Sequence, residues 1–276
     1  MSSHRAGMFA TGASRPEAAG SLPRAMILVR AIARAGRRGA TLADLAAQTG
    51  LPRPTIHRVL DVLERNEWVE RDPVSKAFFL GQELLCLGYG AALRHPVERI
   101  AAPILARLAR DTGQTIYLSV RSGYDAVCIA RHEGVAPVQT VAQYVGARLP
   151  LGHGAGSLAL LAALSPDEAE EVIAFNLPRY RAANPGFDEH VFRGTLADTR
   201  ERGFASHHGL HVRGLSGLGV AVGAPPQPLA AISTAFVTDW LNEDDQRQLA
   251  AHIRDAAGEL ARRLGLERQQ PEKRNA

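Results

Sequence analysis

Hydrophobic residues recur with helical spacing in two short runs that a turn separates. The first run begins behind Thr41, an N-cap residue type, and ends at Gly50, which can adopt the left-handed backbone of a helix C-cap. Leu51 and Pro52 supply the turn. The second run places its apolar side chains on one face, namely Ile56, Val59, Leu60 and Leu63. The pattern predicts two short helices joined by a tight turn.

The other face of the second predicted helix gathers polar side chains near its N-terminus. These are Arg53, Thr55, His57, Arg58 and Asp61. Such a pair of helices is typical of a helix-turn-helix, whose second helix enters the major groove of DNA. We therefore expect Arg53, Thr55, His57 and Arg58 to read bases or phosphates, with Thr41 beside them. A helical hairpin that serves protein contacts is the alternative.

The flanking segments extend this motif on both sides. Residues 21–39 predict a third helix with an inward face of Met26, Val29, Ile32 and Ala33, and an outward face of Arg30, Arg34, Arg37 and Arg38. Residues 68–81 read as strand, turn and strand, with Asp72 and Pro73 in the turn. Arg71 and Lys76 stand beside the tip. Residues 21–80 thus predict a winged helix-turn-helix domain whose wing contacts phosphates or the minor groove.

The rest of the chain alternates strand-like and helical patterns. Glycine-punctuated strand-like runs lie at 115–123, 125–134, 137–146, 215–224 and 229–238. Helical runs lie at 97–113, 154–164, 167–177, 188–202 and 243–264. The last two strand-like runs flank a proline-rich turn and predict a hairpin. The order favours an α+β domain with an antiparallel sheet, covered by helices on one face or both.

These patterns predict two domains with flexible ends. We expect a disordered tail at 1–20, the winged domain at 21–80, a linker helix at 81–95, a second domain at 96–265 and a charged tail at 266–276. The segment 81–95 can equally be the first helix of the second domain.

The glycine-dense loop at 148–157 is the best candidate for a small-molecule site. Glycines let backbone approach a ligand closely, and the following helix presents unpaired amides and the positive end of its dipole. Such an end suits a carboxylate or another anion. No Gly-Lys-Ser/Thr follows, so the loop is not a nucleotide P-loop. A tight turn that merely packs the helix on the sheet is the alternative.

Four histidines raise the question of a metal site: His153, His207, His208 and His211. No acidic residue or cysteine completes a recognisable ligand set, and strand neighbours such as His207 and His208 point to opposite faces. We therefore expect neither metal nor cofactor. The preferred hypothesis is that His153 or His207 donates a hydrogen bond to an effector oxygen.

The motifs that would indicate an enzyme are incomplete. The loop sequence GHGAGS resembles a nucleophile elbow, but its central residue is Ala155, which cannot attack a substrate. His132 and Glu133 lack the second histidine of a zinc protease motif. We expect no catalytic residues, and a DNA-binding domain fused to a catalytic domain is kept as an alternative.

Charge is concentrated in the N-terminal part of the chain. The whole chain of 276 residues has a formal net charge of +4, and the residues up to His95 hold 13 Lys and Arg against 8 Asp and Glu. This excess favours a DNA phosphate backbone as partner, with affinity that weakens steeply with salt. Cys86 and Cys128 lie in apolar context and are expected to be buried thiols. Without a signal peptide or a membrane-spanning segment, the protein is expected in the cytoplasm, with no membrane partner.

The strings TGLPRPTIHRVLDVLERNEWVER, FFLG, TGQTIYLSV and RLPLGHGAGSLALLAAL resemble the IclR-type bacterial transcriptional regulators, over roughly residues 21–265. The resemblance implies that residues 96–265 form a GAF-like effector-binding domain, and that a homodimer or a dimer of dimers binds a near-palindromic operator. It also implies a small organic acid effector, a carboxylate or an aromatic acid. The effector residues that it implies are Leu149, Gly152, His153, Gly154, Ala155, His207, Gly217, Leu218 and Ser233.

This chain departs from the family pattern around that implied pocket. His207 and His208 replace a common acidic pair, Gly217 replaces a pocket cysteine, and Ala235 replaces the second of two serines that contact effector. We expect the small residues Gly217 and Gly219 to enlarge the cavity or to admit backbone contacts, so that the effector is larger than a two- or three-carbon acid.

Overall fold

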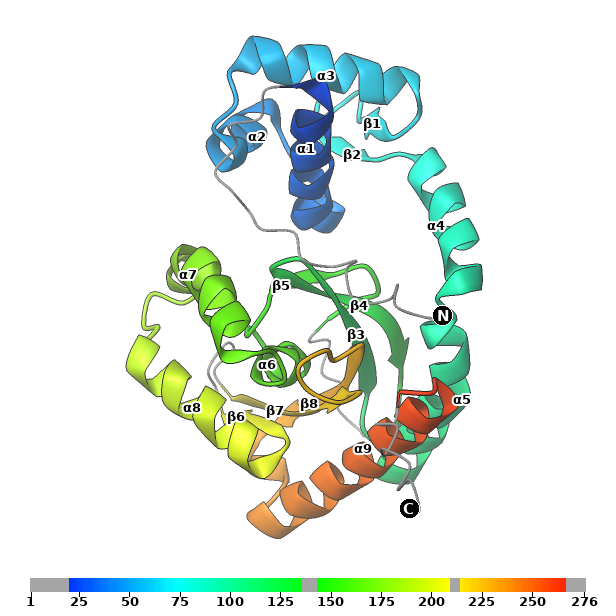
Figure 1. Cartoon of the computed structure of the whole chain (residues 1–276), viewed down its shortest axis with the longest axis vertical. Coiled ribbons are helices and arrows are strands. Elements are labelled where there is room, and N and C mark those ends of the chain that lie inside the picture. The colour runs from blue at the N-terminus through cyan, green and yellow to red at the C-terminus, as the bar shows by residue number, and fades with distance from the viewer. Residues whose placement is uncertain (1–19, 136–142, 209–213, 267–276) are drawn as a thin grey trace, which may run out of the picture. The chain divides into compact units, whose positions relative to one another are not determined.

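The computed structural model describes residues 20–135, 143–208 and 214–266 (Figure 1). Packing divides the chain into two compact units, one that ends at Pro96 and one that begins at Val97. Apart from Gly20 and Leu266, the predicted tails lie outside the described residues. So do His211 and most of the strand predicted at 137–146.

The first unit is a small helical domain with a two-stranded sheet. Its elements are α1 (Ser21–Ala35), a 3₁₀ turn (Gly36–Arg38), α2 (Leu42–Thr49), α3 (Arg53–Arg65), β1 (Val69–Arg71), β2 (Phe78–Leu80) and α4 (Gln82–Arg94). The strands are antiparallel, and Val69 pairs with Leu80. One core joins α1, α2, α3 and the sheet, and its largest fully buried side chains are Leu28, Ile32, Leu45, Ile56 and Leu60. The two predicted helices, their turn and the wing are confirmed.

The inward face predicted for α1 is wrong in part. Leu28, Ala31 and Ile32 are buried, whereas Met26 is 53% exposed. The stripe that meets the core continues to Ala35, and this set follows the i, i+3, i+4, i+7 spacing of one helix face. Met26 lies on another face because it is two residues before Leu28, about half a turn away.

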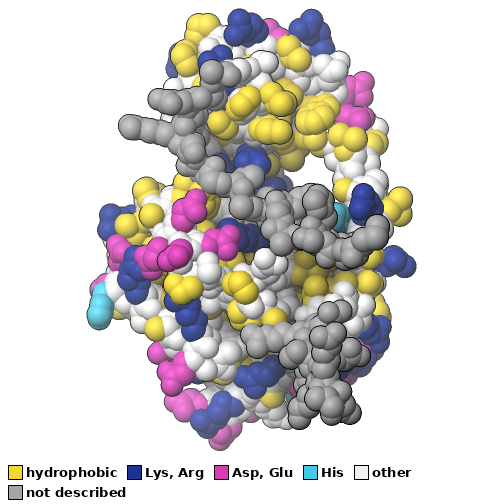
Figure 2. Space-filling view, viewed as in Figure 1, with side chains coloured by type: hydrophobic (Ala, Val, Ile, Leu, Met, Phe, Trp, Pro, Cys, Tyr) yellow, Lys and Arg dark blue, Asp and Glu magenta, His cyan; other side chains and the backbone are white. Residues whose placement is uncertain are grey.

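The helix α4 carries no buried residue. Its apolar side chains Leu85, Leu87, Tyr89 and Leu93 are exposed, and hydrophobic surface is visible along α4 in Figure 2. The prediction that Cys86 is a buried thiol is therefore wrong, because Cys86 shares this uncovered helix. Cys128 is buried, as predicted.

The second unit contains a six-stranded antiparallel sheet. Its strands are β3 (Ile116–Ser122), β4 (Asp125–His132), β5 (Arg148–Pro150), β6 (Ala205–His208), β7 (Leu215–Val222) and β8 (Ala230–Val237). Its helices are α5 (Val97–Thr112), α6 (Ala155–Ala162), α7 (Pro166–Ala183), α8 (Glu189–Arg202), a 3₁₀ turn (Thr238–Trp240) and α9 (Glu243–Arg263). The spatial order of the strands is β5-β4-β3-β8-β7-β6.

Helices cover both faces of this sheet (Figure 1). One core lies between the sheet and the pair α5 and α9, and includes Ile104, Leu218 and Ile253. The other core lies between the sheet and α6, α7 and α8, and includes Leu160 and Phe192. The face that packs against α6 is called the α6 face below. The hairpin predicted around the proline-rich turn is β7–β8, which pairs over its full length. Among the described helices, none combines the length and the apolar character needed to cross a membrane.

Candidate DNA-binding surface and ligand site

The helix α2 is capped at both ends by local features. The Asp44 amide donates to Thr41 Oγ1 at 3.2 Å, and the Thr41 amide donates back to Asp44 Oδ2 at 3.0 Å. These two bonds form a capping box at the start of α2. Hydrogen bonds from Thr41 also hold the pKa of the Asp44 carboxyl below its usual range. Gly50 ends α2 in the left-handed conformation, with φ of 69°.

The helix α3 has the two faces that its sequence predicts. Ile56, Val59, Leu60 and Leu63 are all buried. Arg53, His57 and Arg58 are exposed, whereas Thr55 is half-buried. Lys and Arg side chains lie at the surface in the region of α3 (Figure 2). Because the core uses the whole apolar face, the face that carries Arg53, His57 and Arg58 is left exposed, as is typical of a helix that enters the major groove of DNA.

Thr41 is exposed, but its side chain is committed to the helix cap. Its Oγ1 both accepts from the Asp44 amide and donates to Asp44 Oδ2 at 2.8 Å. A contact between Thr41 and DNA would therefore have to be compatible with the capping box.

The wing is a short hairpin with a closed tip. Asp72 Oδ1 accepts hydrogen bonds from the amides of Val74 at 3.1 Å and Ser75 at 2.6 Å. These bonds, with the Ser75 hydroxyl, lower the pKa of Asp72. The Arg71 guanidinium lies over the Phe78 ring, 5.3 Å from its centroid. Arg71 and Lys76 are both exposed beside the tip, as the sequence predicts.

The glycine-dense loop connects β5 to α6 and closes on itself. The Gly152 amide donates to Ser157 Oγ at 2.7 Å, and Ser157 Oγ donates to the Pro150 carbonyl at 3.0 Å. Gly152 and Gly154 have φ of 98° and 95°, a region that favours glycine. At Gly152 a Cβ would meet the Tyr180 hydroxyl at 2.8 Å and the Phe192 ring at 3.0 Å. For Gly152 the alternative of a packing turn is therefore the better description.

The first turn of α6 lies directly on the sheet. A Cβ on Gly219 would lie 2.6 Å from the carbonyl carbon of Ala155, and a Cβ on Gly156 would lie 2.7 Å from Ser233 Oγ. A Cβ on Gly217 would be 3.0 Å from His207 Nε2 and 3.2 Å from the Ala155 Cβ. The structure thus brings together Ala155, His207, Gly217 and Ser233 at the N-terminus of α6. Leu149 is close to the same place, because its Cδ1 is 3.9 Å from a Cβ built on Gly154.

Two expectations for this site need correction. Leu218 does not face α6, because it packs in the core with α5 and α9. Gly217 and Leu218 are neighbours on one strand, so their side chains point to opposite faces. The small residues on β7 do not enlarge a cavity at Gly219 either. The backbone of α6 fills that space, so the backbone that lies close to Gly219 is that of this helix.

The histidines of the site differ in their surroundings. Burial, and second the charge of Arg179, lower the pKa of His153 to about 4. The imidazole of His153 is therefore neutral near pH 7. His207 is buried on β6, at 9% exposure, and faces Gly217. Among the described residues no group of three His, Cys, Asp or Glu side chains could hold a metal ion. The side chain of His208 and all of His211 lie outside that description.

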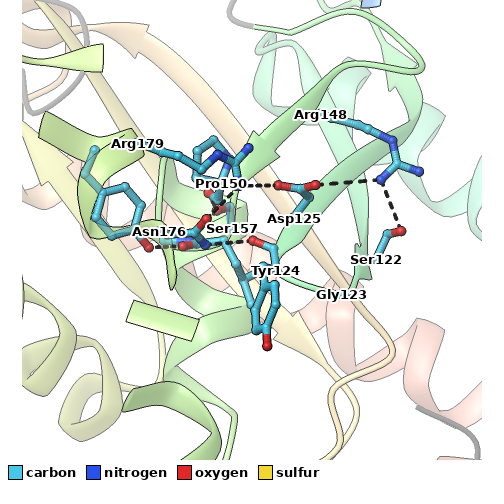
Figure 3. A network of polar contacts seen from close by, with 12 residues as sticks. Ser122, Gly123, Tyr124, Asp125, Arg148, Pro150, Ser157, Asn176 and Arg179 are labelled. Atoms are coloured by element: carbon cyan, nitrogen blue, oxygen red, sulfur yellow. Dashed lines mark hydrogen bonds and ion pairs between the residues drawn. The ribbon is translucent and has the colours of Figure 1, made fainter. Parts of the chain in front are cut away.

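A buried ion-pair network behind the loop was missed by sequence reasoning (Figure 3). Asp125, at 1% exposure, lies 2.6 Å from Arg179 Nη1 and 4.0 Å from Arg148 Nη1. Arg179 also donates to Asn176 Oδ1 at 2.6 Å, and Asn176 Nδ2 donates to the Tyr124 carbonyl at 2.7 Å. The network joins β4, β5 and α7. Because its members are distant in sequence, no local pattern could have identified it.

Two family comparisons cover most of the chain. Residues 21–73 match the family described as IclR helix-turn-helix domain. Residues 90–262 match the family described as bacterial transcriptional regulator IclR C-terminal. The HTH-type transcriptional regulator KipR of Bacillus subtilis is 28% identical over 232 residues, which cover 82% of this chain and 90% of KipR.

Solved structures show the same fold. A putative IclR transcriptional regulator from Silicibacter superposes with a TM-score of 0.77 at 24% identity, over 90% of this chain and 97% of its own. An IclR homologue from Microbacterium hydrocarbonoxydans, solved in complex with 4-hydroxybenzoate, superposes with a TM-score of 0.65 at 23% identity. That comparison covers 90% of this chain and 100% of the homologue.

Proposed function

Because this chain belongs to the IclR family of bacterial transcriptional regulators, we propose that a small organic acid binds beside the N-terminus of α6 and changes its affinity for an operator. The observation that carries the proposal is the convergence of Ala155, His207, Gly217 and Ser233 at that helix end. These residues come from the first turn of α6 and from three strands, and they meet only in the folded protein.

The chemistry of this place suits an organic acid. The first turn of α6 offers backbone amides and no side chain caps it. Ser233 adds a hydroxyl and His207 an imidazole, and the neutral His153 lies in the same loop. Hydrogen-bond donors of this kind bind the oxygens of a carboxylate, a hydroxyl or a carbonyl group. The 4-hydroxybenzoate bound by the Microbacterium homologue supports an aromatic acid as one candidate class.

The DNA-binding half of the proposal assigns α3 to the major groove. Arg53, Thr55, His57 and Arg58 would contact bases or phosphates, while Arg71 and Lys76 on the wing hold the backbone. Thr41 belongs to the same surface through the start of α2, with its side chain in the cap. The binding form would be a homodimer or a dimer of dimers on a near-palindromic operator, in the cytoplasm where its DNA lies. No catalytic role is assigned.

The coupling between the halves would be a two-state equilibrium. An acid that binds one state more tightly shifts the population toward that state, and the shift is limited by the difference in its two affinities. The helix α4 connects the two units in the sequence and is the element through which a change would pass. The same coupling can serve repression or activation.

A titration of fluorescent DNA tests the DNA-binding half. The probe is a duplex from upstream of the gene that encodes the chain. Substituting Arg53→Ala and Arg58→Ala together should weaken binding at least about tenfold, because each lost contact to a base costs about 1 to 3 kcal/mol. Arg247→Ala is the control, since Arg247 is exposed on α9 and pairs with Asp244, three residues before it on the same helix. Full affinity of the double variant would refute the assignment of α3.

A ligand screen tests the effector half separately. Aromatic and aliphatic monocarboxylic acids, including 4-hydroxybenzoate, are screened for a rise in the melting temperature of the wild-type protein. An acid that raises it should also change the affinity for the duplex. If every acid leaves both quantities unchanged, the effector proposal is wrong while the DNA-binding assignment stands.

A further inference from the structure

One row of residues crosses four strands of the sheet. Tyr117 on β3 pairs with Arg131 on β4 and with Ser233 on β8, and Ser233 pairs with Gly219 on β7. Directly opposed residues of antiparallel strands point to the same face. Ser233 and Gly219 contact the first turn of α6. Tyr117 and Arg131 therefore point to the α6 face as well. The order of residues along the row is Arg131, Tyr117, Ser233 and Gly219.

The cationic side chain of Arg131 is mostly buried on this face of the sheet. Its side chain is 21% exposed, and Nη1 contacts the surface carboxylate of Glu133 at 2.5 Å. The edge of the guanidinium that carries Nε lacks such a contact in the described part of the chain. Its Nε is buried and has no hydrogen-bond partner within the described residues. A buried N–H without a partner is costly, and most such groups in proteins are satisfied.

The surroundings of Arg131 stabilise its positive charge. Burial works to lower its pKa, but a hydrogen bond with Tyr117 and the charge of Glu133 outweigh that effect, and the pKa is raised. The guanidinium is thus a permanent cation beside a buried aromatic ring, since Tyr117 is 1% exposed. A planar fork of N–H donors in such a place matches a carboxylate, which can accept two parallel hydrogen bonds.

We propose that Arg131 binds the carboxylate of the effector through the Nε edge of its guanidinium. This inference rests on the proposed function and adds the residue that selects an acid. The amides of α6, Ser233 and His207 then meet the other polar end of the molecule. Two interstrand steps of about 4.8 Å separate Arg131 from Ser233. A ligand that reaches both has the length of a hydroxybenzoate rather than that of a two-carbon acid.

The test compares acids with their primary amides in the full-length protein. The acid that most stabilises the wild type, and its amide, are titrated by calorimetry. The wild type should prefer the acid at least about tenfold, because the amide cannot accept a charged pair of bonds. Arg131→Met should bind acid and amide about equally. Arg110→Met, at an exposed arginine on α5, should retain the wild-type preference.

A second variant covers the case in which Arg131→Met does not fold. Arg131→Lys keeps the positive charge and loses the planar fork, so the preference for acid should fall at least about threefold. Retention of the full preference by the folded variant overturns the inference. If acids bind the wild type and shift DNA affinity while the variant keeps its preference, only the role of Arg131 is wrong. If no acid binds the wild type, the proposed effector fails and this inference fails with it.

Discussion

Glycines on β7 determine how closely α6 approaches the sheet. Gly219 lies under the carbonyl of Ala155, at a distance that no Cβ could tolerate. The first turn of α6 can therefore rest its backbone on the strand, with Ser233 and His207 beside it. The position of Ser233 and His207 beside α6 therefore depends on the lack of a side chain at Gly219.

Substituting Gly219→Ala should disturb the site and the fold together. The new Cβ forces α6 away from the sheet, so we expect a loss of about 1 to 3 kcal/mol in the free energy of unfolding. Urea denaturation measures this loss. Gly194→Ala is the matched control, because Gly194 lies in α8 with no atom within 4 Å of a built Cβ. It should be neutral or stabilising by up to about 1 kcal/mol. Equal stability of both variants would contradict the packing described.

His153 should make the stability depend on pH. Its pKa is lowered from 6.5 to about 4 in the folded protein. Between pH 6.5 and pH 4 the imidazole is protonated in the unfolded chain but neutral in the folded protein. The free energy of unfolding is therefore highest above pH 6.5 and decreases as the pH falls.

Relative to His153→Gln, the wild type should lose about 2 kcal/mol of stability between pH 7 and pH 5. Urea denaturation of both proteins at the two pH values measures the difference. An equal change in the two proteins would show that folding does not lower the pKa of His153.

Single residues also show where sequence reasoning fails. The apolar face of α3 was predicted in full, because Ile56, Val59, Leu60 and Leu63 follow one clean helical stripe. Met26 and Cys86 were placed inside wrongly, since hydrophobic character does not reveal whether another element covers a residue. Leu218 was named with Gly217 as an effector residue, although the alternation of a strand points its side chain to the other face.

At the level of elements, the Asp125 network fastens α7 to the sheet. The carboxylate of Asp125 is buried at the start of β4, and Arg179 reaches it from α7 (Figure 3). Asn176, one turn earlier on α7, bonds to the Tyr124 carbonyl. The strand β5, which leads into the glycine-dense loop, pairs with the same end of β4. The network thus supports the base of the ligand loop.

Substituting Asp125→Asn should destabilise the protein by about 2 to 4 kcal/mol, because it leaves partly buried arginines without their carboxylate. Thermal or urea unfolding measures the loss. Arg193→Met, which removes ion pairs with Glu170 and Glu189 near the surface, is the control and should cost less than about 1 kcal/mol. A similar small cost for both variants would show that the buried network does not fasten α7.

Elements were predictable to different degrees. The capping residues, Gly50 and the wing turn are local signals, and the corresponding helices and strands were found from them. The hairpin β7–β8 was also found. The strand order and the short β5 were not, because they depend on pairing between segments distant in sequence. Arg131 has no local signal at all, since its place in a row with Tyr117 and Ser233 follows from register alone.

For the whole molecule, the account rests on coupling between a DNA-binding unit and a ligand-binding unit. Coupling between two binding sites is reciprocal, so an acid that changes DNA affinity must itself bind with a different affinity when DNA is present. This relation separates true coupling from an acid that only stabilises the second unit.

The most direct test measures the affinity of one acid twice by calorimetry. The acid that most stabilises the wild type is titrated into the free protein and into its complex with the upstream duplex at the same salt concentration. The account predicts affinities that differ at least about fivefold, with the same factor in the DNA affinity measured with and without acid. Equal affinity of the acid for free and DNA-bound protein would contradict it.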